Sequence, residues 1–169
     1  MDETFSRLEI EELCKRFENC GAWSVYSEQD TATKWLKPLL SSLGWDISDQ
    51  NQVREQVLLN KRSNKQKTTN FLDCVLYLKA DYPEIQPHIV FEFKALASGN
   101  LKNKKAQIRK LKDNAKQVHA RYAVFSRFFE TIIYDVGTGK EEAYFRGTDD
   151  YLKNFDALWR YLANPGTAR

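Results

Sequence analysis

The N-terminal part of the chain has apolar residues at helical spacing. An apolar side chain at every third or fourth position predicts an amphipathic helix within residues 1–20. A second helix is predicted through EQDTATKWLKPLLSSLGW, with Ser27 as its N-cap and Gly44 just past its end. Pro38 lies inside this segment and predicts a kink or an offset start, because proline has no N–H to donate.

From Asp46 onward the pattern changes from helical spacing to alternation, which predicts strands. The predicted strands are NQVREQVLL (51–59), FLDCVLYL (71–78), HIVFEFKAL (88–96), RYAVFS (121–126) and TIIYDV (131–136). A basic helix is predicted over 101–119, and a closing helix over 148–163 begins near Thr148 or Asp149. KRSNKQKTTN, DYPEIQP and DVGTGKE are interpreted as connections or turns.

The order of these elements predicts an α/β fold. The first three strands can pair antiparallel through short connections, and the helix after the third permits a parallel crossover to the fourth. We therefore expect a mixed central sheet of about five strands flanked by helices.

Length and composition are those of one ordinary globular domain. No apolar run approaches the roughly 20 residues of a membrane helix, and the acidic N-terminus does not have the pattern of a signal peptide. Cytoplasmic residence without membrane association is the expectation. Cys14, Cys20 and Cys74 lack the spacing of a disulfide framework or a zinc site and are expected to be free thiols.

Charge is unevenly distributed along the chain. Residues 1–30 hold eight acids and three bases, whereas residues 94–121 hold nine Lys or Arg and a single acid, Asp113. A basic block of this kind attracts polyanions such as nucleic acid, although solvated helix faces also carry lysines.

The stretch HIVFEFKAL has the composition of a buried strand, yet it carries Glu92 and Lys94 two residues apart. Residues i and i+2 of a strand share a face about 6.6 Å apart, so the acid and the base lie together while Phe91 and Phe93 point to the other face. Burying such charges without partners is costly. Asp73, early in the preceding apolar strand, supplies a second carboxylate, and the two acids are expected to converge on one Mg²⁺.

The chemistry of that arrangement is metal-assisted hydrolysis of a phosphodiester. The cation lowers the pKa of its bound water, and Lys94 orients the attacking water or stabilises the developing charge. A simpler interpretation stays open from these residues alone. E-x-K triplets occur by chance, and a Glu–Lys pair on a strand can be an ordinary surface ion pair.

Four stretches in one order carry a resemblance to a known group of proteins. They are SEQDTATKWLKPLLSSLGWD, FLDCVL, VFEFKAL and RYAVFSRFFETIIYDV. They resemble the opening helix, the aspartate-bearing strand, the E-x-K strand and the closing strand pair of the PD-(D/E)xK nuclease superfamily. The closest resemblance is to the N-terminal nuclease domain of type I restriction-enzyme R subunits and its stand-alone relatives. It implies one restriction-endonuclease-like domain over 1–169, with its core at 27–136.

The resemblance implies that Asp73 and Glu92 bind metal and that Lys94 is the catalytic lysine. Glu28 falls where many members have a further acid on the first helix. Asp30 is the alternative, and an acid in a first helical turn is also explained by the helix dipole.

Many members also have a glutamine on the helix after E-x-K, with a tyrosine beyond it. Gln107 is the available glutamine, although Lys110 stands at the usual place one turn away. Asn114 stands where the tyrosine often is, and residues 126–128 replace the family's Thr-Asn-Gly turn. The basic helix is expected to contact DNA phosphates through Lys102, Lys104, Lys105, Arg109, Lys110 and Lys112.

The resemblance thus implies a DNA endonuclease that uses Mg²⁺, with Mn²⁺ able to substitute, in restriction or antiviral defence. A non-catalytic DNA-binding or assembly module and a repair or junction-resolving nuclease are the alternatives. No motor with a Walker-type loop follows the nuclease-like segment, so a free-standing enzyme, an excised domain, a homodimer and a subunit of a larger defence complex all stay open. The tryptophans are expected mainly in the core, whereas Phe128 and Phe129, at a turn, are predicted to be exposed contacts.

Overall fold

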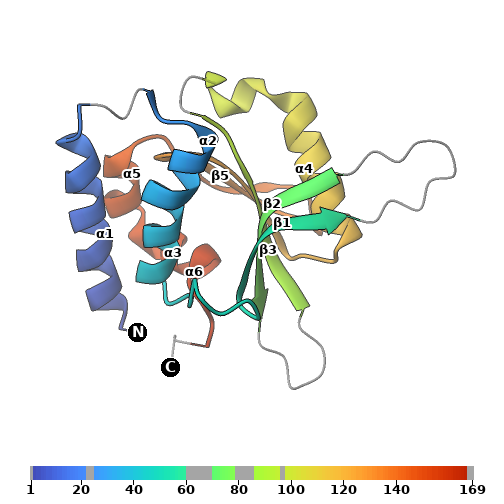
Figure 1. Cartoon of the computed structure of the whole chain (residues 1–169), viewed down its shortest axis with the longest axis horizontal. Coiled ribbons are helices and arrows are strands. Elements are labelled where there is room, and N and C mark those ends of the chain that lie inside the picture. The colour runs from blue at the N-terminus through green and yellow to red at the C-terminus, as the bar shows by residue number, and fades with distance from the viewer. Residues whose placement is uncertain (1, 22–24, 60–69, 79–85, 96–97, 167–169) are drawn as a thin grey trace, which may run out of the picture.

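The computed structural model describes residues 2–21, 25–59, 70–78, 86–95 and 98–166. The elements form three layers, with a central sheet between two groups of helices (Figure 1). The helices α1, α3, α5 and α6 cover one face of the sheet, and α4 covers the other (Figure 1). The predicted α/β class with a mixed sheet flanked by helices is confirmed.

The sheet contains six strands in the order of the chain. They are β1 Val53–Leu59, β2 Asn70–Leu78, β3 Gln86–Phe93, β4 Tyr122–Arg127, β5 Glu130–Asp135 and β6 Glu141–Phe145. Only β3 and β4 pair in parallel, and every other neighbouring pair is antiparallel. The predicted meander and parallel crossover are therefore present. The expectation of about five strands missed β6, a short edge strand that opens with two glutamates.

The helices follow the predicted order, but the second predicted helix and the closing helix are each divided into shorter segments. They are α1 Glu3–Glu18, α2 Glu28–Asp30, η2 Thr31–Leu36, α3 Lys37–Ser42, η4 Leu101–Asn103, α4 Lys105–Gln117, α5 Thr148–Lys153 and α6 Phe155–Leu162. The predicted closing helix is divided at Asn154 into α5 and α6, and Gly147 is the N-cap of α5. Within the ranges that the structure describes, no helix is long and apolar enough to cross a membrane.

The second predicted helix begins as expected but changes its winding before Pro38. Ser27 caps α2 in a reciprocal capping box with Asp30. The turns of η2 are π-helical, and the N–H of Lys37 bonds to the carbonyl of Ala32, five residues earlier. This wider turn lies directly before Pro38, the residue that cannot donate a helical hydrogen bond. The predicted irregularity is therefore a π segment.

Each face of the sheet has its own hydrophobic cluster. The larger one lies under α1, α3, α5 and α6 and includes Trp35, Phe91 and Phe93. The smaller one includes Leu111 and Ala115 of α4. Trp35 and Trp45 are buried and Trp159 is half-buried, in agreement with the expected core role, whereas Trp23 lies outside the described residues, as do most of KRSNKQKTTN and DYPEIQP. Cys14, Cys20 and Cys74 form no disulfide bond, as expected.

The prediction of an exposed Phe128 is wrong. Its φ of +49° at the β4–β5 turn directs the ring inward, where the side chain is fully buried. The ring stacks on Tyr26 with centroids 5.2 Å apart and meets Phe17 edge-on at 5.0 Å. Phe129 is half-buried and packs against the same cluster. The tip of this hairpin is therefore part of the core.

Candidate active site

The candidate site lies where β2 and β3 separate. Their antiparallel ladder ends at the pair Cys74 and Phe91, and one further step in the same register places Asp73 opposite Glu92. The main-chain N–H of Phe93 donates to Oδ2 of Asp73 at 2.7 Å. Where the ladder of main-chain hydrogen bonds between β2 and β3 ends, the Asp73 carboxylate accepts the next main-chain N–H of β3. The two predicted metal-binding acids face one another at this fork.

Lys94 connects the acids of the site. Its Nζ lies 2.8 Å from Oε1 of Glu92 and 3.5 Å from Oε1 of Glu28, and it donates to the carbonyl of Phe93 at 2.6 Å. The Lys94 side chain is 14% exposed. Its main-chain N–H donates to the carbonyl of Ser126 on β4 at 2.9 Å, which fixes the backbone after β3 ends. The structure therefore brings together Glu92, Lys94 and Glu28.

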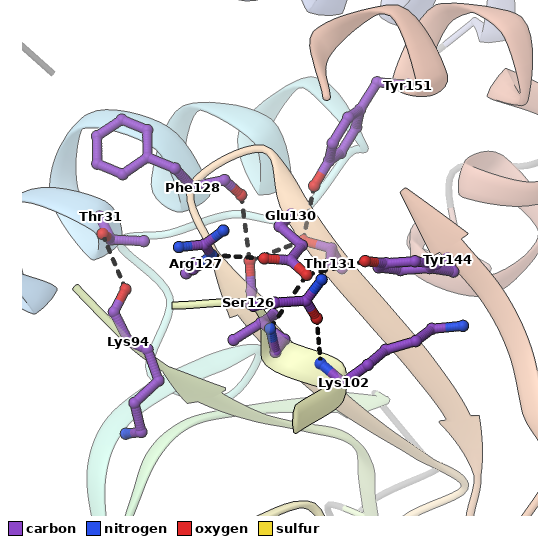
Figure 2. Close-up of polar contacts among 12 residues, drawn as sticks. Thr31, Lys94, Lys102, Ser126, Arg127, Phe128, Glu130, Thr131, Tyr144 and Tyr151 are labelled. Carbon is purple, nitrogen blue, oxygen red and sulfur yellow. Dashed lines mark hydrogen bonds and ion pairs between the residues drawn. The ribbon is translucent and has the colours of Figure 1, made fainter. Parts of the chain in front are cut away.

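The two acids of α2 have different surroundings. Asp30 bonds to Lys34 at 2.8 Å and to Ser27, and these contacts lower the pKa of its carboxyl to about 2. Glu28, two residues earlier in the chain, is the acid that contacts Lys94. The start of the helix is also tied to the site because Oγ1 of Thr31 donates to the carbonyl of Lys94 at 3.4 Å (Figure 2). Of the two candidate acids, Glu28 is the one at the site.

Burial and neighbouring charge perturb both Asp73 and Lys94. Burial raises the pKa of the Asp73 carboxyl to about 6, and the negative charge of Glu92 adds to the increase. Burial alone would lower the pKa of Lys94, but the hydrogen bond and charge of Glu92 and the charge of Glu28 outweigh it and raise that pKa. Lys94 therefore stays an ammonium, while Asp73 is a carboxyl whose charge is costly without a cation.

A cavity of about 320 Å³ opens beside the fork. Its lining is formed by Glu28, Gln29, Ala32, Glu55, Gln56, Asp73 and Phe93. Glu55 and Gln56 were not predicted as site residues, because VREQVLL has the alternation of an ordinary strand. Glu55 is held by Lys37 at 2.9 Å. Gln56 has a φ of +50° and stands at the ladder position opposite Asp73, between the pairs formed by Glu55 and Val57.

The predicted DNA-binding residues of the basic helix differ in how they are held. Lys102 pairs with Glu141 at 3.0 Å, and Lys112 donates to the carbonyl of Gly139 at 3.2 Å. Arg109 has a long pairing with Asp113, 3.9 Å, on an exposed surface. The members whose side chains make no hydrogen bond or ion pair with a described residue are Lys104, Lys105 and Lys110, of which Lys105 and Lys110 are exposed. Their part in binding DNA stays a prediction.

Gln107 lies in the first turns of α4, which begins at the end of the sheet where β3 ends (Figure 1). It is exposed, as is Lys110, and no hydrogen bond joins its side chain to a described residue. Asn114, in contrast, is buried on the face that packs toward the sheet. The structure therefore does not bring Gln107 into the cluster of Glu28, Glu92 and Lys94.

A buried polar network supports the β4–β5 turn beside Lys94 (Figure 2). Glu130 is 3% exposed, pairs with Arg127, and accepts from the N–H of Leu101 at 3.1 Å and the hydroxyl of Tyr144 at 2.9 Å. One carboxylate thereby ties η4, the segment that leads into α4, to the turn after β4. No residue of this network was singled out from the sequence except Arg127, as part of the replaced turn.

A second chain of hydroxyls lies next to it in Figure 2. Tyr151 donates to Oγ1 of Thr131 at 2.6 Å, and that hydroxyl is 2.7 Å from Oγ of Ser126. All three side chains are buried. They connect α5 to Ser126 of β4, whose main-chain carbonyl accepts the N–H of Lys94.

Comparison with known proteins gives one similarity. No family profile and no curated protein matches the chain. Among solved structures, the chain is similar to a fragment of a chain assigned as the HsdR subunit of a type I restriction enzyme from Vibrio vulnificus YJ016. The two are 22% identical with a TM-score of 0.49, over 79% of this chain and 25% of that chain. The chain thus spans about a quarter of the length of that structure.

Proposed function

We propose that the protein is a metal-dependent endonuclease that hydrolyses phosphodiester bonds in DNA. The observation that carries the proposal is the fork between β2 and β3, where Asp73 and Glu92 stand opposite one another and Lys94 forms an ion pair with Glu92 at 2.8 Å. Two acids and one ammonium in a partly open site match the needs of a reaction in which negative charge develops on phosphate.

The donor set fits a hard divalent cation. Carboxylate and carbonyl oxygens are the ligands that Mg²⁺ and Mn²⁺ prefer, and Mg²⁺ commonly takes one or two carboxylates with water and phosphate completing the shell. Among the described residues no group of three or more His, Cys, Asp or Glu is placed to hold one ion. Asp73 and Glu92 are the two carboxylates that would hold it.

The roles of the side chains follow from their contacts. A bound Mg²⁺ supplies an activated water and neutralises charge on the phosphate. Lys94, held as an ammonium by Glu92 and Glu28, places a positive charge and N–H donors beside the acids, where it orients the attacking water or stabilises the pentacoordinate phosphate. Glu28 positions Lys94 from the first turn of α2.

The substrate and the context are also proposals. Exposed cations in the first half of α4, such as Lys105 and Lys110, are suited to contacting the phosphate backbone of DNA. The resemblance of the E-x-K region to type I restriction nucleases favours restriction or antiviral defence as the setting. Sedimentation measures whether the protein forms a homodimer or a larger complex.

The test is cleavage of supercoiled plasmid, linear duplex and single-stranded DNA in Mg²⁺, Mn²⁺ or EDTA. Asp73→Ala and Lys94→Ala are compared with wild type, and Lys153→Ala, an exposed lysine of α5 paired with Asp149, is the matched control. Thermal unfolding of every variant shows that it is folded. We expect cleavage that needs the metal, is lost in both site variants and is kept in the control.

Two results would contradict the proposal. Cleavage that persists in EDTA or in Asp73→Ala would come from another site or another protein. Intact DNA in every lane, from a protein that still binds it, would identify a non-catalytic DNA-binding or assembly module.

A further inference from the structure

Two large apolar side chains are exposed side by side on β1 and β2. Leu58 is 49% exposed and Phe71 is 46% exposed, and the two are direct partners in the antiparallel ladder. Their sequence neighbours Leu59 and Leu72 are 4% and 1% exposed. Because successive side chains of a strand point to opposite faces, one row of this ribbon is buried and the other presents an aromatic ring and a leucine to solvent.

This apolar pair continues directly from the candidate active site. Phe71 precedes Asp73 by two residues on β2, so their Cα atoms are about 6.6 Å apart. On the partner strand, Leu58 follows Gln56, which lines the cavity beside Asp73. A chain whose phosphate lies at Asp73 would therefore bring an adjacent nucleotide within reach of Phe71.

Charge favours a polyanion over a second copy of the protein as the occupant. The connection between the two strands, residues 60–69, contains four Lys or Arg and no acid in the sequence. Two copies that met through this ribbon would bring two such basic segments together, whereas a nucleic acid would meet opposite charge. Phe71 offers a ring that any base can stack on, whatever the sequence.

We propose that Phe71 and Leu58 form a subsite for an unpaired nucleobase next to the phosphate held at Asp73. The inference rests on the proposed nuclease function and deepens it. It makes the preferred substrate a single strand, or a duplex with an unpaired segment, because a base inside an intact duplex is already stacked and cannot lie on Phe71.

The experiment measures binding of a fluorescein-labelled oligothymidylate and of a blunt duplex by fluorescence anisotropy in Ca²⁺, which takes the same oxygen ligands as Mg²⁺ but with a looser geometry. Gel electrophoresis of each sample shows that the DNA is intact. Phe71→Ala is compared with Phe71→Tyr, which keeps the ring, and with Phe5→Ala. Phe5 is 50% exposed on α1, a helix that lies away from β1 and β2 (Figure 1), and is the matched control for removing an exposed phenylalanine.

We expect Phe71→Ala to weaken binding of the single strand by about 10-fold, within the range that base–aromatic stacking supplies. Binding of the duplex should change less than about 2-fold, and Phe71→Tyr and Phe5→Ala should bind as wild type does. Equal affinity of Phe71→Ala and wild type for the single strand would overturn the inference. An equal loss on both substrates would also overturn it, because contact with the phosphate backbone alone would explain that result.

Sedimentation of the same samples tests the competing occupant. A wild-type dimer that becomes a monomer in Phe71→Ala, with unchanged affinity for DNA, would identify the patch as a contact between two copies. Cleavage measured in parallel separates this inference from the proposed function. A protein that never cleaves, but loses single-strand binding in Phe71→Ala, would keep the subsite and reject the nuclease.

Discussion

Asp73→Asn is expected to make the metal-free protein more stable at neutral pH while abolishing cleavage. Burial raises the pKa of the Asp73 carboxyl from 3.8 to about 6. At about 1.4 kcal/mol per pH unit, this increase corresponds to about 3 kcal/mol of unfavourable free energy when the group is ionised. Asp73 is only half-buried, so solvent screening reduces the expected cost to about 1 to 2 kcal/mol. Asparagine removes the charge and keeps an oxygen that can accept the N–H of Phe93.

The difference in unfolding free energy between Asp73→Asn and the wild type depends on pH. Below about pH 4 the carboxyl is protonated in both the folded and the unfolded chain, so the charge has no effect on stability. As the pH rises toward about 6, the unfolded chain loses its proton first, and the wild type loses stability relative to the variant. Above that pH the difference is complete. The advantage of Asp73→Asn should therefore be absent at pH 3.5 and full at pH 8.

The assay is urea unfolding followed by tryptophan fluorescence, in EDTA, at several pH values between 3.5 and 8. Asp135→Asn is the control with the opposite sign, because the N–H of Thr138 lowers the pKa of that carboxyl. It should destabilise at pH 8. Added Mg²⁺ should stabilise the wild type and not Asp73→Asn, since only a site with both acids binds the ion in the folded state. An Asp73→Asn variant that is less stable than the wild type at pH 8 would refute the argument. A difference in unfolding free energy between the two proteins that is the same at every pH would also refute it.

Three further predictions follow from the surroundings of the site. Gln56→Gly should be more stable than Gln56→Ala by about 1 kcal/mol, because both remove the side chain but only glycine relaxes a φ of +50°; equal stabilities in urea would contradict it. Glu130→Ala should lose about 3 to 5 kcal/mol because it leaves Arg127 without its carboxylate, whereas Tyr144→Phe should lose about 1 to 2 kcal/mol; similar losses in the two variants would contradict it. Lys110→Ala should reduce the slope of log binding constant against log salt by about 1, and an unchanged slope would remove that residue from the phosphate contacts.

The sequence predicts the elements that depend on periodicity and capping. Ser27 begins its helix as expected because a serine side chain can accept a first-turn N–H, and the alternation of apolar residues locates five of the strands. The facing of Asp73 and Glu92 is a consequence of the antiparallel register, which the short connection between their strands implies but does not fix. The site is therefore foreseeable as a set of residues and not as a geometry.

The features that the sequence does not predict depend on tertiary contacts. Phe128 occupies a turn, where local pattern predicts exposure, but the aromatic cluster around Phe17 and Tyr26 accepts its ring. Nothing in the local sequence predicts the left-handed conformation of Gln56, since glutamine rarely adopts it. The strand β6 is short and begins with charged residues, so its pairing with β5 is visible only in three dimensions.

The buried tip of the β4–β5 hairpin determines where the chain can accept an inserted peptide. Hairpin tips are ordinarily among the most permissive places for insertion, because their residues are exposed. Here an insertion next to Phe128 would withdraw a fully buried ring from the packing of the N-terminal helices and displace the backbone that holds Lys94. In the turn between β5 and β6, Gly137 and Thr138 are exposed. The bond from the N–H of Thr138 to Asp135 is local to the turn and does not involve Lys94. A fluorescent tag or an affinity sequence introduced between Gly137 and Thr138 would report on the protein at work without disturbing its site.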